Sequence, residues 1–138
     1  MALTLAARPV IAGAATGTIL RLDQPISFWG GVDPQSGRLT DPRGPHPGRS
    51  IAGHVLALRA TRGSSSSSAV MLELIARGLA PAAILLCEID AILGLGIVVA
   101  REMGHAAPPL LEITRALHDG LPDGAPATIA PDGTIRIA

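Results

Sequence analysis

The segment from residue 25 to residue 49 most constrains what this chain can fold into. After Pro25 it contains four prolines and five glycines, namely Pro34, Pro42, Pro45, Pro47, Gly30, Gly31, Gly37, Gly44 and Gly48. Proline removes a backbone donor and glycine adds conformational freedom, so neither a helix nor a central strand can run through it. The sequence therefore predicts a long ordered loop, and long loops inside compact domains commonly carry function.

Periodic segments on both sides of this loop predict β-strands. Alternating polar and apolar residues predict a strand over residues 16–22, and we expect the opening segment, residues 3–11, to pair with it. The wholly apolar run at residues 82–87 is typical of a strand buried on both faces. Further strands are predicted over residues 51–60 and 109–113, with a terminal β-hairpin over 127–129 and 134–137.

Two main helices are expected between these strands. Apolar residues at helical spacing predict a helix over residues 69–77, which Gly78 would end. Asp90 is a suitable N-cap for a second helix that continues to Gly104. The chain is therefore expected to be a single α/β domain over residues 1–138, with a mixed, barrel-like sheet.

The composition excludes several functional classes. The 11 basic residues are all arginines and are balanced by 11 acidic residues, so the electrostatic signature of a nucleic-acid or anionic-membrane binder is missing. Without lysine there is no Schiff-base chemistry. Cys87 is the one cysteine, so a disulfide or a Cys-rich metal site cannot form within the chain. No signal peptide or membrane span is predicted, and a cytoplasmic location is expected.

The core must be aliphatic, because 48% of residues are hydrophobic but only 1% are aromatic. Phe28 and Trp29 are the two aromatic residues, and they are adjacent. Two interpretations stay open: they lie at a cleft rim or a partner interface, or they fill the core of the domain itself.

The sharpest motif is a run of five serines, Ser64 to Ser68, preceded by Arg62 and Gly63. It joins the end of a predicted strand to the start of a predicted helix, which is where ligands bind in α/β folds. Unpaired N–H groups at a helix start bind carboxylates or phosphates and lower the cost of an alkoxide. The competing interpretations are a flexible linker and a simple helix N-cap.

Other motifs carry weaker functional hypotheses. The chain lacks the G-x-S-x-G motif that surrounds an activated serine in hydrolases. Its four histidines show no spacing typical of a catalytic base or of metal ligands. Gly94-Leu95-Gly96 lacks the third glycine of a dinucleotide loop and is better explained by helix packing. The Gly30-Gly31-Val32-Asp33 segment could form a pocket wall, with Gly31 and Asp33 lining it, or a structural turn.

Taken together, the motifs resemble the swivel domain, or small subunit, of the aconitase X family. The stretches that carry the resemblance are FWGGVDPQSGRLTDPRGPHPG, SIAGHVL, RGSSSSS and APAAILLCEIDAILGLGIVVA, in this order. The resemblance implies a swivelling β/β/α fold and a hydro-lyase (dehydratase) assembled from this chain and a large subunit. It also implies that an iron or iron–sulfur centre lies on the large subunit, so no metal or cofactor is expected on this chain.

The resemblance assigns roles to individual residues. Ser64, the first serine after Gly63, would be the base, and Ser65 would bind the substrate. Aconitase itself has an arginine where this chain has Ser66, so Arg62 is a candidate replacement for that anion contact. Gly31 and Asp33 complete the expected substrate site.

The resemblance implies a small hydroxy-acid substrate. Some family members dehydrate cis-3-hydroxy-L-proline to Δ1-pyrroline-2-carboxylate, and others dehydrate mevalonate 5-phosphate. The alanine-rich, lysine-free composition favours a bacterial source and hence the hydroxyproline reaction. A non-catalytic swivel module that only binds a partner is the alternative from a different class.

Overall fold

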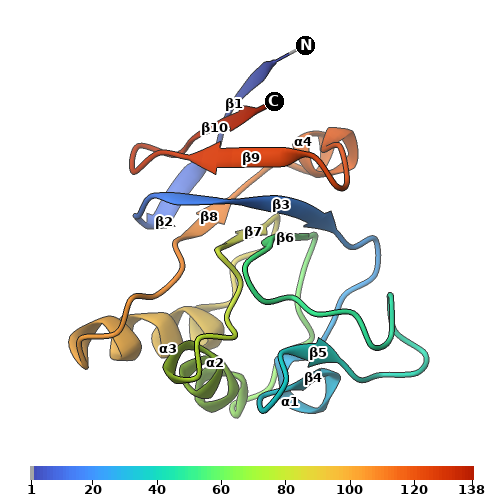
Figure 1. Ribbon diagram of the computed structural model, residues 1–138, viewed down its shortest axis with the longest axis vertical. Helices are drawn as coiled ribbons and strands as arrows, with labels where there is room; N and C mark the ends of the chain where they lie inside the picture. Colours follow the sequence, from blue (N-terminus) through green and yellow to red (C-terminus); the bar gives the residue numbers. More distant parts are fainter. Residues whose placement is uncertain (1) are drawn as a thin grey trace.

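A computed structural model describes residues 2–138, which form the mixed α/β fold expected from the sequence (Figure 1). The strands are β1 (Leu3–Ala6), β2 (Arg8–Ile11), β3 (Ala15–Arg21), β4 (Val32–Asp33), β5 (Arg38–Leu39), β6 (Val55–Leu58), β7 (Ala83–Leu86), β8 (Leu110–Glu112), β9 (Pro126–Ile129) and β10 (Thr134–Ile137). The helices are α1 (Phe28–Gly31), α2 (Ser67–Ala76), α3 (Ala91–Glu102) and α4 (Arg115–Gly120).

Eight strands form one mixed sheet in the order β1-β10-β9-β3-β6-β7-β8-β2. The central pairs β3–β6, β6–β7 and β7–β8 are parallel, and the outer pairs are antiparallel. Ala7 alone separates β1 from β2, yet these strands occupy opposite ends of the order. The sheet must therefore curve until its two ends approach each other, which gives the barrel-like core.

The expected pairing of the opening segment was wrong. Residues 3–11 form two strands, and neither pairs with β3: β1 pairs with β10, and β2 pairs with β8. The partner of β3 on its antiparallel side is β9. Strand β1 reaches β10 across almost the whole length of the chain, and local sequence carries no signal for so distant a partner.

Both faces of the central strands are buried, which explains their unbroken apolar sequence. Leu56 and Ile84 point toward a core shared with α2 and α3, whereas Val55 and Leu85 point into the barrel interior. Figure 1 shows the two layers, with α2 and α3 on one side of β6 and β7, and β9 and β10 on the other. All four of these side chains are fully buried.

The helices begin and end close to their expected bounds. Asp90 caps α3 as expected: its side chain accepts hydrogen bonds from the N–H groups of Ile92 and Leu93, at 3.0 and 3.1 Å. Helix α2 starts two residues earlier than expected, inside the serine run. Helix α4 was not expected, because it is only six residues long; Thr114 caps it through the N–H of Leu117.

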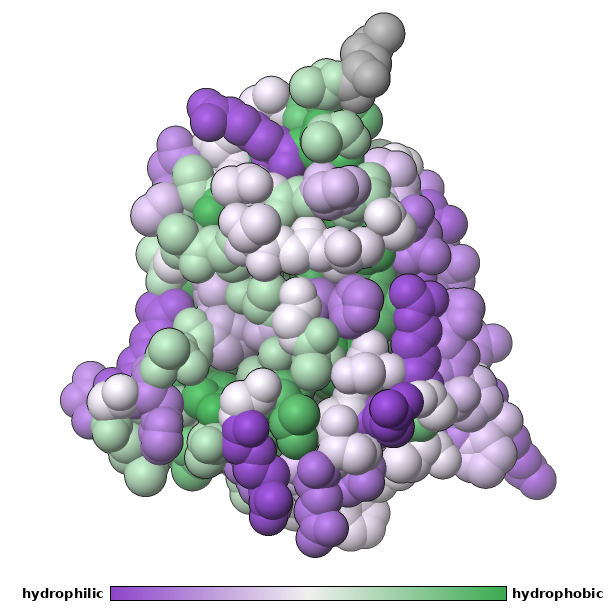
Figure 2. Space-filling model, in the orientation of Figure 1, coloured by the Kyte–Doolittle hydropathy of each residue, from purple (hydrophilic) through white to green (hydrophobic). Residues whose placement is uncertain are grey.

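The segment of residues 25–49 is mostly loop, as expected, but contains the single turn α1 and the two-residue hairpin β4–β5. On the face drawn in Figure 2, hydrophilic and hydrophobic residues form a mosaic without one continuous apolar band. Within residues 2–138, no helix has both the length and the apolar character needed to span a membrane.

Candidate functional site

The candidate site lies where the parallel strands end. Because β3, β6, β7 and β8 run in the same direction, the segments that follow them gather at one edge of the sheet. Three pockets open at this edge. They are lined by residues that follow β3 and β6, and by residues that follow β7 and β8.

The serine run forms an ordered turn and the start of α2. Ser64 lies before the helix, and its hydroxyl oxygen accepts a hydrogen bond from the Ser66 N–H at 3.2 Å. The Ser64 carbonyl also accepts one from the Ser67 N–H at 3.1 Å. An oxygen that already accepts a backbone N–H at the positive end of a helix is better able to carry negative charge.

Contacts with two other segments hold the residues just before this run in place. The Arg62 N–H donates to the Ile26 carbonyl at 2.9 Å. The Thr61 hydroxyl donates to Asp90 Oδ2 at 2.7 Å, so the carboxylate that caps α3 also anchors the approach to the serines. The linker interpretation of the run is therefore wrong, because these contacts fix the residues before it and its last two serines belong to α2.

Gly96 brings α3 against the first turn of α2. A Cβ atom at this position would lie 2.5 Å from the Ser68 carbonyl oxygen, so only glycine allows this approach. The Gly94-Leu95-Gly96 motif lies inside α3 and not in a loop. The packing explanation for this motif is therefore confirmed, and the glycine helps to position the serine run.

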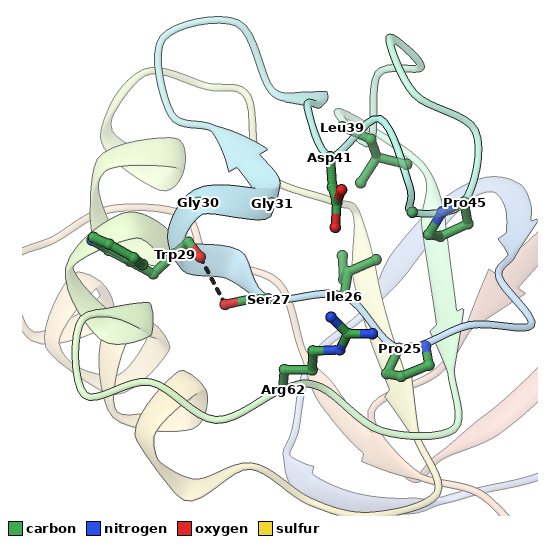
Figure 3. Close-up of a pocket in the computed structure, with 11 residues that line it drawn as sticks. Pro25, Ile26, Ser27, Trp29, Gly30, Gly31, Leu39, Asp41, Pro45 and Arg62 are labelled. Carbon is green, nitrogen blue, oxygen red and sulfur yellow. Dashed lines mark hydrogen bonds between the residues drawn. The ribbon is translucent and has the colours of Figure 1, made fainter.

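A pocket of about 140 Å³ opens beside Arg62, between the loop that follows β3 and the segment after β5 (Figure 3). Gly31 lines this pocket, and its role in substrate binding stays a prediction. The full lining is Pro25, Ile26, Ser27, Trp29, Gly30, Gly31, Leu39, Asp41, Gly44, Pro45 and Arg62. The pocket thus joins two candidate residues that are 31 positions apart in sequence, Gly31 and Arg62.

Asp33 does not line this pocket. Its carboxylate accepts hydrogen bonds from the Gln35 N–H at 2.9 Å and from the Ser36 hydroxyl at 2.8 Å, within the β4–β5 turn. These bonds, led by the Gln35 N–H, lower the pKa of Asp33 below its ordinary value. The turn interpretation therefore describes the contacts of Asp33, and its role in substrate binding stays a prediction.

Asp41 is the pocket residue that sequence reasoning missed. Its carboxylate points into the pocket, toward Ile26 and Arg62 (Figure 3). The available signal was its position in the long Pro- and Gly-rich loop, directly before Pro42. Only the fold shows that this carboxylate, and not that of Asp33, faces the arginine.

The two aromatic residues have different environments. Phe28 is fully buried in the core that the sheet shares with the helices. Trp29 is 59% exposed, and its indole points away from the pocket (Figure 3). Phe28 therefore fills the core, whereas Trp29 is on the surface, and its place at a cleft rim or a partner interface stays a prediction.

The ionisable residues do not form a metal site or a hydrolase triad within the described chain. Across residues 2–138, no three His, Cys, Asp or Glu side chains are grouped as metal ligands would be. Burial raises the pKa of the Cys87 thiol. The two described histidine side chains with hydrogen bonds, His54 and His118, contact Thr18, Leu22 and Asp119 and no serine of the run.

Comparisons with known proteins match this chain to one family over almost its whole length. The family model for the aconitase X swivel domain matches residues 4–137. The chain is similar to the cis-3-hydroxy-L-proline dehydratase of Pseudomonas aeruginosa, with 49% identity over 102 residues. That match covers 73% of this chain but 18% of the dehydratase, so the chain spans less than a fifth of that relative.

Smaller relatives and a solved structure match over most of their length. The phosphomevalonate dehydratase small subunit of Methanopyrus kandleri is 34% identical over 119 residues, which cover 86% of this chain and 84% of that subunit. The crystal structure of Thermococcus kodakaraensis aconitase X, in its holo-form, superimposes with a TM-score of 0.86 at 29% identity. That superposition covers 99% of this chain and 98% of the matched chain.

Proposed function

Because the chain belongs to the aconitase X swivel-domain family, we propose that it is the swivel subunit of an aconitase X-type dehydratase. In this proposal residues 1–138 act as one domain, and Ser64 is the group that accepts the substrate proton. The enzyme is active only when a large subunit completes the site. The surroundings of Ser64, just before the start of α2 and two residues after Arg62, are the observation that carries the proposal.

Ser64 needs help to act as a base, because a serine hydroxyl is otherwise far too weakly acidic to exist as an alkoxide. The Ser66 N–H already donates to its oxygen, and the N-terminal end of α2 contributes a positive partial charge. Exclusion of water by the partner subunit would strengthen both interactions. The alkoxide would take the proton from the carbon next to the substrate carboxylate while the hydroxyl on the adjacent carbon leaves.

Neighbouring residues would bind and orient the substrate. Ser65 is exposed at the same turn and can donate a hydrogen bond to a carboxylate. Arg62 offers a guanidinium, which binds carboxylates through two parallel hydrogen bonds. Gly31 would form part of the pocket wall without a side chain to obstruct it, and Asp33 is retained as a substrate-binding hypothesis.

The iron centre that the family implies is assigned to the large subunit, because the described residues of this chain offer no grouped ligands for it. When bound there, iron would act as a Lewis acid toward the leaving hydroxyl. The contribution of this chain is limited to accepting the proton and orienting the carboxylate. The large aconitase X subunit is thus the partner we propose, and the compartment we propose is the cytoplasm.

We assign cis-3-hydroxy-L-proline as the substrate, with Δ1-pyrroline-2-carboxylate as the product. The 49% identity with the Pseudomonas aeruginosa dehydratase favours it. Dehydration of mevalonate 5-phosphate is the second candidate, favoured by similarity to phosphomevalonate dehydratase small subunits such as that of Pyrococcus furiosus, 38% identical over 96 residues.

The decisive experiment compares Ser64→Ala with Ser68→Ala in the complex with the large subunit, purified anaerobically. Ser68 belongs to the same run, and its hydroxyl reaches only the Ser65 carbonyl at 3.5 Å. Loss of the proton acceptor should lower kcat about a hundredfold or more, whereas Ser68→Ala should keep it within a few-fold. Activity of Ser64→Ala within a few-fold of wild type would favour a non-catalytic swivel module.

Substrate assignment needs a separate measurement, with both compounds offered to the wild-type complex. Turnover of cis-3-hydroxy-L-proline alone is the expected result. Turnover of mevalonate 5-phosphate would keep the role of Ser64 and overturn the substrate, and failure of the two chains to associate would overturn the subunit assignment.

A further inference from the structure

The pocket beside Arg62 has opposite charges on facing walls. The guanidinium of Arg62 comes from the segment after β6, and the carboxylate of Asp41 comes from the segment after β5. Figure 3 shows both charged groups directed toward the same space, with Ile26 between them. A ligand that enters this space would meet a cation on one side and an anion on the other.

Neither charge is neutralised by a neighbour. The salt bridges found in residues 2–138 are Arg8–Glu112, Arg21–Asp23, Arg59–Asp119, Arg77–Glu73 and His118–Asp119. Arg62 and Asp41 therefore lie in the same pocket without forming an ion pair. One oxygen of Asp41 accepts the Arg43 N–H at 2.9 Å, which orients the carboxylate and leaves its second oxygen for a ligand.

The remainder of the pocket is small, and apolar side chains form part of its wall beside Ser27 and three glycines. The side chains of Pro25, Ile26, Leu39 and Pro45 line it, and its volume is about 140 Å³. A cavity of about 150 Å³ is enough to hold one benzene molecule. The space is therefore suited to a compact ring and not to a long flexible chain.

We propose that Asp41 is a specificity-determining residue that binds the ammonium group of a cyclic, zwitterionic amino acid while Arg62 binds its carboxylate. This inference rests on the proposed function and specifies its substrate class. An apolar pyrrolidine ring with one carboxylate and one secondary ammonium matches the pocket in size and in the sign of both charges. Nothing in the sequence pattern alone had assigned a role to Asp41.

The same arrangement disfavours the alternative substrate. Mevalonate 5-phosphate has a carboxylate and a phosphate but no cationic group, so the Asp41 carboxylate would repel it. Repulsive groups that act against a competing ligand are a general source of specificity. Asp41 thus supplies an electrostatic reason for the pocket to prefer the amino acid.

The test measures binding of two ring carboxylates, L-proline and cyclopentanecarboxylate, to the complete complex by calorimetry. They share ring size and carboxylate, and only L-proline has the ammonium group. Wild type should bind L-proline about tenfold or more tightly than cyclopentanecarboxylate, because a hydrogen bond to a charged group is worth that much. Asp41→Asn should reduce this preference to about twofold or less and raise KM for the hydroxyproline more than it lowers kcat.

Asp132→Asn is the matched control. Asp132 also accepts the N–H of the residue two positions on, from Thr134 at 2.9 Å, but lies in the β9–β10 turn away from the pocket. Both Asn variants keep an oxygen for their turn, so a difference between them reports on the free carboxylate oxygen. Asp132→Asn should preserve the preference for L-proline.

Equal binding of the two ligands by wild type, no measurable binding of L-proline, or an unchanged preference in Asp41→Asn would overturn the inference. The Ser64→Ala complex separates this result from the proposed function. It should lose turnover but keep the preference for L-proline. Retained turnover would refute the role of Ser64, and the binding comparison would still decide the role of Asp41.

Discussion

Replacing Gly96 with alanine tests whether the close approach of α3 to α2 positions the serine run. The new methyl group would lie 2.5 Å from the Ser68 carbonyl oxygen and 3.1 Å from the Ser68 Cα. Backbone atoms must therefore move by roughly 1 Å to reach ordinary contact distance. Overpacking of this kind costs about 1–3 kcal/mol, and the better helix propensity of alanine returns about 1 kcal/mol.

Gly94→Ala provides the comparison, because Gly94 lies in the same helix and gains the same propensity. Its new Cβ would meet the flexible end of Leu110, at 3.3 Å, and no backbone atom. The unfolding free energies of the two variants should therefore differ by about 2 kcal/mol in favour of Gly94→Ala. For a chain of 138 residues, this corresponds to a difference in Tm of about 6–10 °C.

Thermal unfolding followed by far-ultraviolet circular dichroism measures this difference, and kcat of the reconstituted complex measures its effect on the serines. Gly96→Ala should unfold at the lower temperature and should have the lower kcat. Equal or greater stability of Gly96→Ala relative to Gly94→Ala would refute the packing argument. Lower stability with unchanged kcat would show that the contact supports the fold but does not position Ser64.

Three further outcomes are expected. Hydrogen bonds from Arg59 and His118 lower the pKa of Asp119 from 3.8 to about 2. The stability that these bonds contribute is therefore complete above pH 4 and is lost as the pH falls toward 2. The free energy of unfolding in urea should differ between Asp119→Asn and wild type at pH 6 and should become equal near pH 2. Asp90→Ala should lower the free energy of unfolding by about 1–2 kcal/mol in the same assay, because it removes the α3 cap and the acceptor of the Thr61 hydroxyl. Trp29 is the one tryptophan of a chain that contains no tyrosine, and it is 59% exposed. Its fluorescence should shift to shorter wavelength if the large subunit covers it and should stay unchanged if the interface lies elsewhere.

The elements that sequence predicted well are those with strong local signals. The apolar run around Leu85 was typical of a buried strand, and Asp90 marked the start of α3 through its capping side chain. Helix α4 escaped prediction because one short, polar turn has little hydrophobic periodicity. The pairing of β1 was missed because strand partners depend on the closure of the whole sheet and not on adjacent residues.

The residues of the candidate site likewise divide into those that local sequence singled out and those that only the fold reveals. Ser64 and Arg62 belong to one continuous motif, so the sequence singled them out together. Asp41 faces Arg62 only because the segment after β5 folds back toward the segment that follows β6. Asp33 was the more conspicuous acid, two residues after the Gly30-Gly31 pair, but its carboxylate is engaged in its own turn. Short-range patterns identify reactive groups, whereas the facing walls of a pocket come from long-range topology.

The pairing of β1 with β10 also determines when folding of the sheet can finish. Leu3 pairs with Ile137, so β1 cannot pair until β10 has been synthesised. Contacts between such distant residues slow folding, because the chain must close a long loop before they form. During that interval β1 presents an unpaired strand edge, which is a site for misassociation. Folding of this domain should therefore benefit from chaperones that hold β1 until β10 emerges.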